Sequence, residues 1–380
     1  MTDIERILPL WRELKVASAD YVLATVVAVE GSSYRKPGAC MLLAPDGRRA
    51  GTVSGGCLEA GVARRAWWNS EKGPVVQRYS SVEEDGDFPY GSGCGGVVYL
   101  LLERRSTAGP LLAALEQAFE LRTPLAVATV LDGPQVGQRA FAGLPGFAPA
   151  SGSVPAELQD LATTALERGI SIERAISIDG TETRAWADFR PARHGLWIFG
   201  AGDDALPLLA LAKEMGWFVT VADSRSQLAT RVRFPKADAL HVQSVLDLPG
   251  RPPAAPAPAF AQLHPTDAAV LLTHSFEQDS HVLAALLSLR FPLAYIGVLG
   301  PQRRTRKLLA EAARLLHLST NEAQIEHWLA ELHAPMGLDL GAESPETIAL
   351  SAVAEIQKSF TSATALPLRQ VRAASLTTPS

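Results

Sequence analysis

Apolar residues in the first thirty positions change from one spacing to another. The helical spacing, with intervals of three and four residues, is carried by Ile4, Ile7, Leu8, Trp11 and Leu14. The run that follows, YVLATVVAV at 21–29, is rich in β-branched residues and long enough for a buried strand. The pattern therefore predicts an N-terminal helix that leads into a sheet.

Short strand patterns and helical patterns alternate through the rest of the first half. The predicted strands are 40–44 and 50–53, which flank the turn at Pro45-Asp46-Gly47, then 75–79, 97–103, 125–131, 171–178 and 183–189. The predicted helices are 58–68, 111–121 and 157–168. The stretch 132–154 is rich in Gly and Pro and lacks periodicity, which is typical of a surface excursion. We therefore predict a mixed α+β domain over residues 1–192.

The pattern changes after Pro191-Ala192-Arg193. The segment LWIFGAGDDALPLLALAKEMGWFVTVADSR reads strand, glycine turn, helix, strand, as at the start of a doubly wound parallel sheet. Two later strands, 268–273 and 293–298, each precede a helix. The sequence thus predicts an α/β, Rossmann-like domain over 193–361, with a Pro/Ala-rich linker at 249–265 and a disordered tail at 362–380.

The composition is that of a packed globular protein, since 47% of the residues are hydrophobic and 20% are charged. A formal net charge of −5 offers no basic stripe for a phosphate backbone, which argues against a nucleic acid partner. No apolar run approaches the roughly 20 residues of a membrane span, and the first residues lack the apolar core of a signal peptide. We expect a cytoplasmic protein with no membrane partner.

The three cysteines, Cys40, Cys57 and Cys94, lie in the first quarter of the chain, and all eight histidines lie between His194 and His333. An odd number of cysteines without a secretion signal argues against a disulfide framework. Because no Cys-x-x-Cys or His-x-x-x-His pair occurs, the sequence does not predict a structural zinc site.

Two of the cysteines lie between glycines. Cys57 falls in GTVSGGCLE, where a strand ends and a helix begins, so backbone amides and the helix dipole would stabilise a thiolate. Cys94 falls in GSGCGG, whose glycines are costly to order unless a close approach of the backbone offsets that cost. A reactive thiol or soft ligand and a plain turn remain open for both positions. Cys40 lies inside an apolar strand, which indicates a core residue.

Three separated motifs together resemble the XdhC/CoxI family of accessory proteins for molybdenum hydroxylases such as xanthine dehydrogenase. In chain order they are GSSYRKPGACMLLAPDGRRAGTVSGGCLE, GCGG and LHAPMGLDLGAESPETIALSAVAEI. The resemblance covers nearly the whole chain apart from the Gly/Pro-rich excursion, the Pro/Ala-rich linker and the tail.

The resemblance implies a cytoplasmic chaperone, not an enzyme, that binds the molybdenum cofactor (molybdopterin), protects it during sulfuration and delivers it to the target hydroxylase. On the same basis a cofactor-handling surface would be formed by Gly55, Gly56, Cys57, Glu59, Gly93, Cys94 and Gly95. Cys57 and Cys94 are the candidate molybdenum ligands, since molybdenum and its terminal sulfur are soft partners for thiolate. A cysteine desulfurase is a further candidate partner, and we expect a homodimer.

The second half carries the spacing of a dinucleotide fingerprint. Gly200 and Gly202 follow a strand and open a helix, and Asp223 ends the next strand with Arg225 beside it. Asp203 and Asp204 occupy the helix start, where they would satisfy the dipole and repel a pyrophosphate. The spacing therefore predicts the fold, whereas NAD(P) as a cofactor is doubtful.

A second strand-glycine-helix junction has the opposite charge. Gly300 is followed by Arg303 and Arg304 at the helix start, where cations are unfavourable by about 0.3–1 kcal/mol each. An anion at this position would relieve the strain, so we infer an oxyanion or phosphate site, which the family resemblance supports. A solvated basic helix face is the alternative.

Thr273, His274 and Asp279 follow another parallel strand, at the sheet edge where open α/β folds bind ligands. His274 could donate to a phosphate or a pterin, with Asp279 orienting its ring. Further along, Ser344 and Pro345 predict the cap and the first residue of a helix.

Three functions are consistent with these features. The first is the molybdenum-cofactor chaperone that the resemblance implies. The second is an NAD(P)-dependent oxidoreductase, for which His274 is the candidate proton donor. The third is a regulator that binds a small molecule in the same crevice without transferring it.

Overall fold

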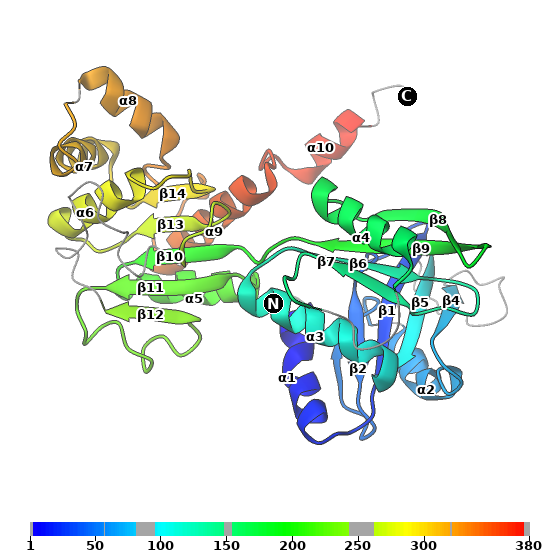
Figure 1. Ribbon diagram of the computed structural model, residues 1–380. Helices are drawn as coiled ribbons and strands as arrows, with labels where there is room; N and C mark the ends of the chain where they lie inside the picture. Colours follow the sequence, from blue (N-terminus) through cyan, green and yellow to red (C-terminus); the bar gives the residue numbers. More distant parts are fainter. Residues whose placement is uncertain are drawn as a thin grey trace. The chain divides into compact units, whose positions relative to one another are not determined.

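The computed structural model describes residues 3–56, 58–80, 96–147, 154–242, 262–319 and 321–375. The chain divides into two compact units, with the division between Arg193 and His194 (Figure 1). Among the helices of these residues, none has both the length and the apolar character that crossing a bilayer requires.

The first unit contains a five-stranded antiparallel sheet in the order β3-β2-β1-β5-β4. Its strands are β1 (Val22–Glu30), β2 (Cys40–Leu43), β3 (Arg49–Gly51), β4 (Val75–Ser80) and β5 (Val97–Arg104). Side chains alternate between its faces. Leu23 and Leu42 pack with α1 (Asp3–Val16) and α3 (Arg105–Leu121), and Ala24 and Met41 pack with α2 (Glu59–Asn69).

The same unit contains a second antiparallel sheet in the order β7-β6-β9-β8. Its elements are β6 (Leu125–Val130), β7 (Arg139–Ala142), β8 (Ile172–Ile178), β9 (Thr181–Arg190) and the helix α4 (Ala156–Arg168). Ala126, Ala128 and Val130 face α4, whereas Leu125 and Val127 join the cluster around α1 and α3. The α1/α3 layer therefore shares a core with both sheets.

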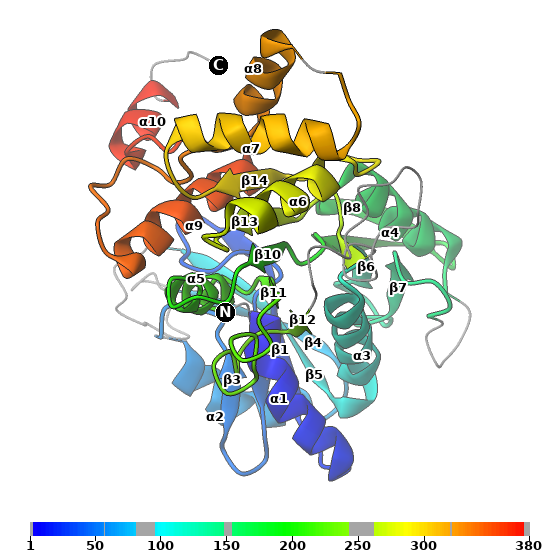
Figure 2. The same cartoon turned by 90° about the vertical axis from the view of Figure 1, so that its left-hand side faces the viewer.

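The second unit is built on a five-stranded parallel sheet in the order β12-β11-β10-β13-β14, which can be followed in Figure 2 from β14 near the top to β12. The strands are β10 (Gly195–Phe199), β11 (Phe218–Asp223), β12 (Ala239–Val242), β13 (Ala268–Leu271) and β14 (Tyr295–Val298). Both faces are covered, as is typical of parallel sheets. Leu196 and Ile198 of β10 pack with one set of helices, and Trp197 and Phe199 pack with the other.

The helices of the second unit fall into those two layers. On the Leu196 side lie α5 (Ala205–Glu214) and α9 (Pro345–Thr361). On the Trp197 side lie α6 (Phe276–Leu287), α7 (Gln302–Leu315) and α8 (Glu322–Glu331). At the β14 edge, His333 bridges to Gly297, so the segment before α9 runs along the sheet. These two helix layers are those of a doubly wound fold.

The predicted fold class, a mixed α+β domain followed by a Rossmann-like domain, is confirmed. Two strand and helix predictions were wrong in detail. The excursion at 132–154 contains β7, which pairs with β6 because Ala140 faces the α4 core. Helix α3 begins at Arg105, six residues before the predicted start, and accommodates Pro110 in its second turn.

The structure describes part of the Pro/Ala-rich linker and part of the tail, which the sequence predicts to be disordered. Leu263, near the end of the Pro/Ala-rich linker, is buried in the α6/α7 layer, whereas 243–261 lie outside the described residues. In the tail, α10 (Leu368–Ser375) forms after Pro367, whose carbonyl accepts from the amides of Gln370 and Val371.

Candidate functional site

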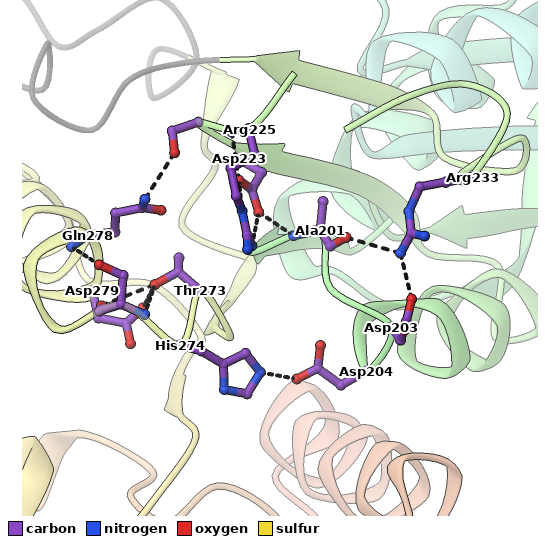
Figure 3. A network of polar contacts seen from close by, with 12 residues as sticks. Ala201, Asp203, Asp204, Asp223, Arg225, Arg233, Thr273, His274, Gln278 and Asp279 are labelled. Atoms are coloured by element: carbon purple, nitrogen blue, oxygen red, sulfur yellow. Dashed lines mark hydrogen bonds and ion pairs between the residues drawn. The ribbon is translucent and has the colours of Figure 1, made fainter. Parts of the chain in front are cut away.

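The carboxyl ends of β10, β11, β13 and β14 bring together the candidate residues of the second unit. Figure 3 shows Asp223, Arg225, Thr273, His274 and Asp279 among them in a network of polar contacts. The residues that the sequence predicted and that meet at this edge are Gly200, Gly202, Asp223, Arg225, Thr273, His274, Asp279, Gly300, Arg303 and Arg304. Such an edge is where open α/β sheets bind their ligands.

The two glycines of the turn after β10 have different roles. Gly200 has φ +124°, and a Cβ atom there would lie 2.4 Å from the Leu272 carbonyl oxygen, so only glycine allows β10 and the end of β13 to approach. At Gly202 a Cβ atom would lie 2.8 Å from a carboxylate oxygen of Asp204. The first glycine therefore sets the backbone, and the second leaves room for the Asp204 side chain.

Asp223 binds the backbone of this turn through its carboxylate. Its side chain is fully buried and accepts from the Ala201 amide at 2.7 Å, from the Arg225 amide at 2.8 Å and from the Arg225 guanidinium at 2.8 and 3.0 Å (Figure 3). Burial raises the pKa of Asp223, but these hydrogen bonds outweigh it and leave the pKa below its ordinary value. The carboxylate that would bind a ribose and one amide that would cradle a pyrophosphate are thus both engaged internally.

The two acids at the start of α5 do not cap the helix with their side chains. Asp203, 89% exposed, pairs with Arg233 at 2.7 Å. Asp204 pairs with Nε2 of His274 at 2.8 Å, and the His274 backbone is left-handed, with φ +59° (Figure 3). The prediction that these acids satisfy the helix dipole is therefore only partly right, because their carboxylates are directed to Arg233 and His274 of other segments.

Asp279 has a different partner from the one predicted. It does not orient His274. Its side chain, 2% exposed, accepts from the Thr273 hydroxyl at 2.6 Å and from the Arg304 guanidinium at 2.7 Å. The prediction was wrong because closeness in sequence placed Asp279 beside His274, whereas the first turn of α6 directs it toward α7. Asp279 thus fixes Arg304.

The start of α7 is basic and has no side-chain cap. Pro301 occupies the cap position, no acid lies in the first turn, and Gly300 before it has φ +106°. Arg303 is exposed and has no ion pair within the described part of the chain. Arg304 is held by Asp279, and Arg306 pairs with Glu322 and Glu326 of α8. Arg304 is thus fixed beside the smaller cavity, and Arg303 is exposed without an ion pair in the described residues.

Two cavities meet at this edge of the sheet. One, of about 420 Å³, reaches from the α5 start to α9, and the other, of about 230 Å³, lies toward the α7 start. Leu272, His274 and Leu299 line both. The first has Asp203, Asp204 and Glu343 in its wall, and the second has Asp279 and Arg304. The larger volume is in the range of small-molecule sites, so the edge can accommodate a ligand.

In the first unit, the candidate residues before α2 surround a buried carboxylate. Glu59 accepts from the amides of Val53 and Ser54 at 3.2 and 2.9 Å and from the Ser54 hydroxyl at 2.6 Å. Burial raises the pKa of Glu59, but the hydrogen bonds from the Ser54 hydroxyl and these amides lower it by more. The pKa of Glu59 is therefore below its ordinary value. The Ser54 oxygen in turn accepts from Gly56 and Leu58. Glu59 therefore shapes the loop that carries Gly55 and Gly56.

The loop after β1 touches the described flanks of both cysteine motifs. A Cβ atom at Gly55 would lie 3.6 Å from the Tyr34 ring, and one at Gly96 would lie 2.1 Å from the Ser32 carbonyl oxygen. Glycine at 96 is thus required by a close backbone approach. Cys57, Gly93, Cys94 and Gly95 lie outside the described residues. Among the residues described, no group of three or more His, Cys, Asp or Glu is arranged to hold a metal.

Cys40 is fully buried in β2, as expected of a core residue. Its surroundings are more polar than the sequence predicted. The thiol donates to the Gly38 carbonyl at 3.2 Å, and the Arg190 guanidinium lies 3.8 Å from the sulfur while it pairs with Asp188. Arg190 belongs to β9 and also donates to the Gly38 carbonyl, so this group links the two sheets of the unit.

Five further residues of the second-unit site were not predicted from the sequence. These are Arg233, Leu299, Met336, Glu343 and Gln278, the last of which donates to Ser224. The acids at the α5 start were noticed but were not given partners. An acidic helix start that follows the glycine fingerprint signals that cations elsewhere in the chain must meet it, although it does not say which ones.

Similarity to known proteins extends over both units. The XdhC Rossmann domain matches residues 196–356, and the XdhC and CoxI family matches residues 16–80. A crystal structure described as a xanthine dehydrogenase from Bacillus halodurans shares 29% identity with a TM-score of 0.69, and the likeness covers 95% of this chain and 96% of that one. The chain thus belongs to the class of proteins in which an α+β unit is followed by an XdhC-type Rossmann unit.

Two relatives extend the similarity over most of their own length. A protein of Bacillus subtilis (strain 168), named as a probable xanthine dehydrogenase subunit, is 33% identical over 342 residues, which cover 88% of this chain and 92% of the relative. The molybdenum cofactor insertion chaperone PaoD of Escherichia coli (strain K12) is 28% identical over 366 residues, which cover 94% of this chain and 89% of the relative. The chain belongs to the XdhC and CoxI family.

Proposed function

We propose that this protein is an accessory chaperone that binds the molybdenum cofactor, assists its sulfuration and inserts it into a molybdenum hydroxylase of the xanthine dehydrogenase type. The observation that carries the proposal is the similarity to a relative named as a molybdenum cofactor insertion chaperone, which covers 94% of this chain and so includes both units. The cofactor is cargo on this account, and the protein itself performs no redox step.

The second unit supplies residues that suit the phosphate end of such a cargo. The Arg304 guanidinium, fixed by the buried Asp279, lines the smaller cavity together with Gly300, and Arg303 is exposed one residue away. A guanidinium already held in place loses little entropy when it binds a phosphate, which favours Arg over Lys in this role. His274, whose Nε2 meets Asp204, lines both cavities. These residues fit an anionic cofactor.

The first unit supplies the thiols. Cys57 and Cys94 are the candidate soft ligands for molybdenum or its terminal sulfur, and a cysteine desulfurase is the class of enzyme that would provide that sulfur. The described flanks of both motifs contact the same loop, through Tyr34 and Ser32. Glu59, bound to the amides of Val53 and Ser54, keeps that end of the α2 loop in a fixed shape. We assign Gly55, Gly56 and Glu59 to shaping the surface and the two cysteines to its chemistry.

An NAD(P)-dependent oxidoreductase is the less favoured function. Asp223 would have to give up Arg225 and the Ala201 amide to accept from a ribose, and Asp203 and Asp204 would face the pyrophosphate. Both changes cost free energy that a dinucleotide would need to recover.

The experiment is activation of a cofactor-free hydroxylase. The enzyme is incubated with limiting molybdenum cofactor in the presence of wild-type protein, Cys57→Ser or Cys40→Ser, and its activity is followed. We expect the wild type to activate the enzyme. Cys57→Ser should lower the activation at least tenfold, because a hydroxyl lacks the soft sulfur. The folded fraction of Cys40→Ser should activate the enzyme as well as the wild type does. Equal activation with and without the protein would contradict the function, and full activity of Cys57→Ser would contradict the role of that thiol.

A further inference from the structure

The larger cavity of the second unit differs in character from the smaller one beside it. Its floor is aliphatic and is formed by Leu208 of α5, Leu272 after β13, Met336, and Ile348 of α9. Its polar wall consists of His274 and three acids. Arg304 lines the smaller cavity, and no arginine or lysine of the described chain lines the larger one.

This division separates two kinds of ligand chemistry. A phosphate in the larger cavity would meet three carboxylates, so that cavity disfavours an anion. An aliphatic floor favours a flat ring with apolar faces, and acids in the wall favour an edge that carries N–H donors. The anionic part of the same ligand would be directed past His274, which lines both cavities, toward Arg304.

Of the three acids, Glu343 is the one with neither carboxylate oxygen paired within the described residues. Asp203 is paired with Arg233, and Asp204 is paired with His274 through Oδ2, although its buried Oδ1 has no hydrogen-bond partner there. The Glu343 side chain has neither a hydrogen bond nor an ion pair within the described residues, while its backbone amide is held by Thr347 at the start of α9. Its carboxylate presents two acceptor oxygens and no donor. The best partner is therefore an edge with two adjacent N–H donors, which a carboxylate binds in a bidentate manner.

We propose that this cavity binds a 2-amino-4-oxopyrimidine ring, the ring system that guanine and pterins share, through Glu343. That ring presents an amino group next to a ring N–H, so two donors meet the two carboxylate oxygens. Adenine presents an amino donor next to a ring acceptor, so one of its two positions repels the carboxylate. The inference rests on the proposed function in one respect: that function decides whether a pterin or guanine is the natural occupant.

The test is isothermal titration of the full chain with three probes: 6-hydroxymethylpterin, GMP and AMP. Glu343→Gln removes one acceptor at constant size, and Glu346→Gln is the matched control, because Glu346 lies at the same exposed helix start but does not line the cavity. Thermal unfolding of each variant checks that it folds. We expect the pterin and GMP to bind at least tenfold more tightly than AMP, and Glu343→Gln alone to lower both affinities at least tenfold.

Tighter binding of the pterin assigns the cavity to the cofactor ring, and tighter binding of GMP assigns it to a guanine nucleotide; either supports the inference. It is overturned if neither ring binds, if AMP binds equally well, or if Glu343→Gln binds like the wild type. Cofactor retention by the wild type is measured in parallel. Ring binding without retention contradicts the proposed function alone, and retention without ring binding contradicts this inference alone.

Discussion

The starts of α5 and α7 are the same local structure with opposite uses. Each follows a parallel strand and a glycine of positive φ, and neither has a side-chain cap. At α5 the turn is satisfied from inside the protein, because Asp223 accepts from the Ala201 amide and the acids there meet His274 and Arg233. At α7 there is no acid in the first turn, and Arg303 is exposed.

The difference teaches that a glycine fingerprint identifies a fold and not a ligand. A strand-glycine-helix junction attracts an anion only where its amides and dipole are left unsatisfied. By that criterion the start of α5, which has the dinucleotide spacing, already has acceptors from the protein itself. The start of α7, which lacks that spacing, has no acid in its first turn. The anion of a bound cofactor is therefore expected at α7.

The largest effect is expected from Asp223→Asn. The change removes the charge and turns one acceptor into a donor that faces the Arg225 guanidinium and the backbone amides, so unfolding free energy should fall by about 3 kcal/mol. Urea denaturation measures the loss, with Asp339→Asn, an exposed acid of the same unit, as the control. A loss no larger than that of the control would mean that Asp223 does not hold the α5 turn.

The pH dependence follows from the same carboxylate. A folded pKa below the ordinary value means that Asp223 stabilises the fold above the unfolded pKa of about 3.9, and that this stability is lost as the pH falls through the folded value. The wild type should therefore lose stability below about pH 4 more steeply than Asp223→Asn. Melting temperatures measured between pH 7 and pH 3 provide the check, and parallel curves for the two proteins would refute it.

The two arginines at α7 should separate stability from binding. Arg304→Gln leaves the buried Asp279 with Thr273 alone, so we expect a loss of about 2 kcal/mol in unfolding free energy. Arg303→Gln should change stability by less than about 0.5 kcal/mol, because the residue is exposed and removing a cation relieves the helix dipole.

Phosphate binding completes that comparison. Stabilisation by inorganic phosphate should be weaker in Arg303→Gln than in the wild type, since charged hydrogen bonds contribute about 1.5–3 kcal/mol. Thermal unfolding across a phosphate series measures it. If Arg303→Gln retains the full phosphate effect, the basic start of α7 is only a solvated face.

The smallest effect is expected from NAD(P). The Ala201 amide and the Asp223 carboxylate are engaged, so calorimetric titration with NAD or NADP should give weak binding or none. Tight binding that Asp223→Ala weakens would reverse the roles assigned to the two junctions.

The elements of this fold are largely predictable from the sequence, and the pairing of its polar side chains is not. The Ser344 cap with Pro345 at the helix start was predicted and confirmed, because capping is decided within four residues. His274 meets an acid 70 positions away, and Asp279 meets an arginine 25 positions away. Such partners depend on which strands are neighbours in the sheet, and sequence proximity gave the wrong partner for Asp279.

Short or atypical segments were missed for a local reason. Strand β7 has only four residues and follows glycines and prolines, so no periodicity marks it, and burial of Ala140 against the α4 core decides its place. The proposal of molybdenum cofactor as cargo began with the resemblance of three motifs, because neither composition nor spacing points to molybdenum.

The central claim is that the protein carries the molybdenum cofactor, and mass spectrometry of the bound small molecules tests it most directly. Wild type and Arg303→Gln are purified from a host that makes the cofactor, and their bound species are released and identified. We predict a molybdopterin species on the wild type and at least tenfold less of it on Arg303→Gln, the factor expected for one charged hydrogen bond of about 1.4 kcal/mol or more. NAD(P) in its place, or no molybdopterin species on the wild type, would contradict the account.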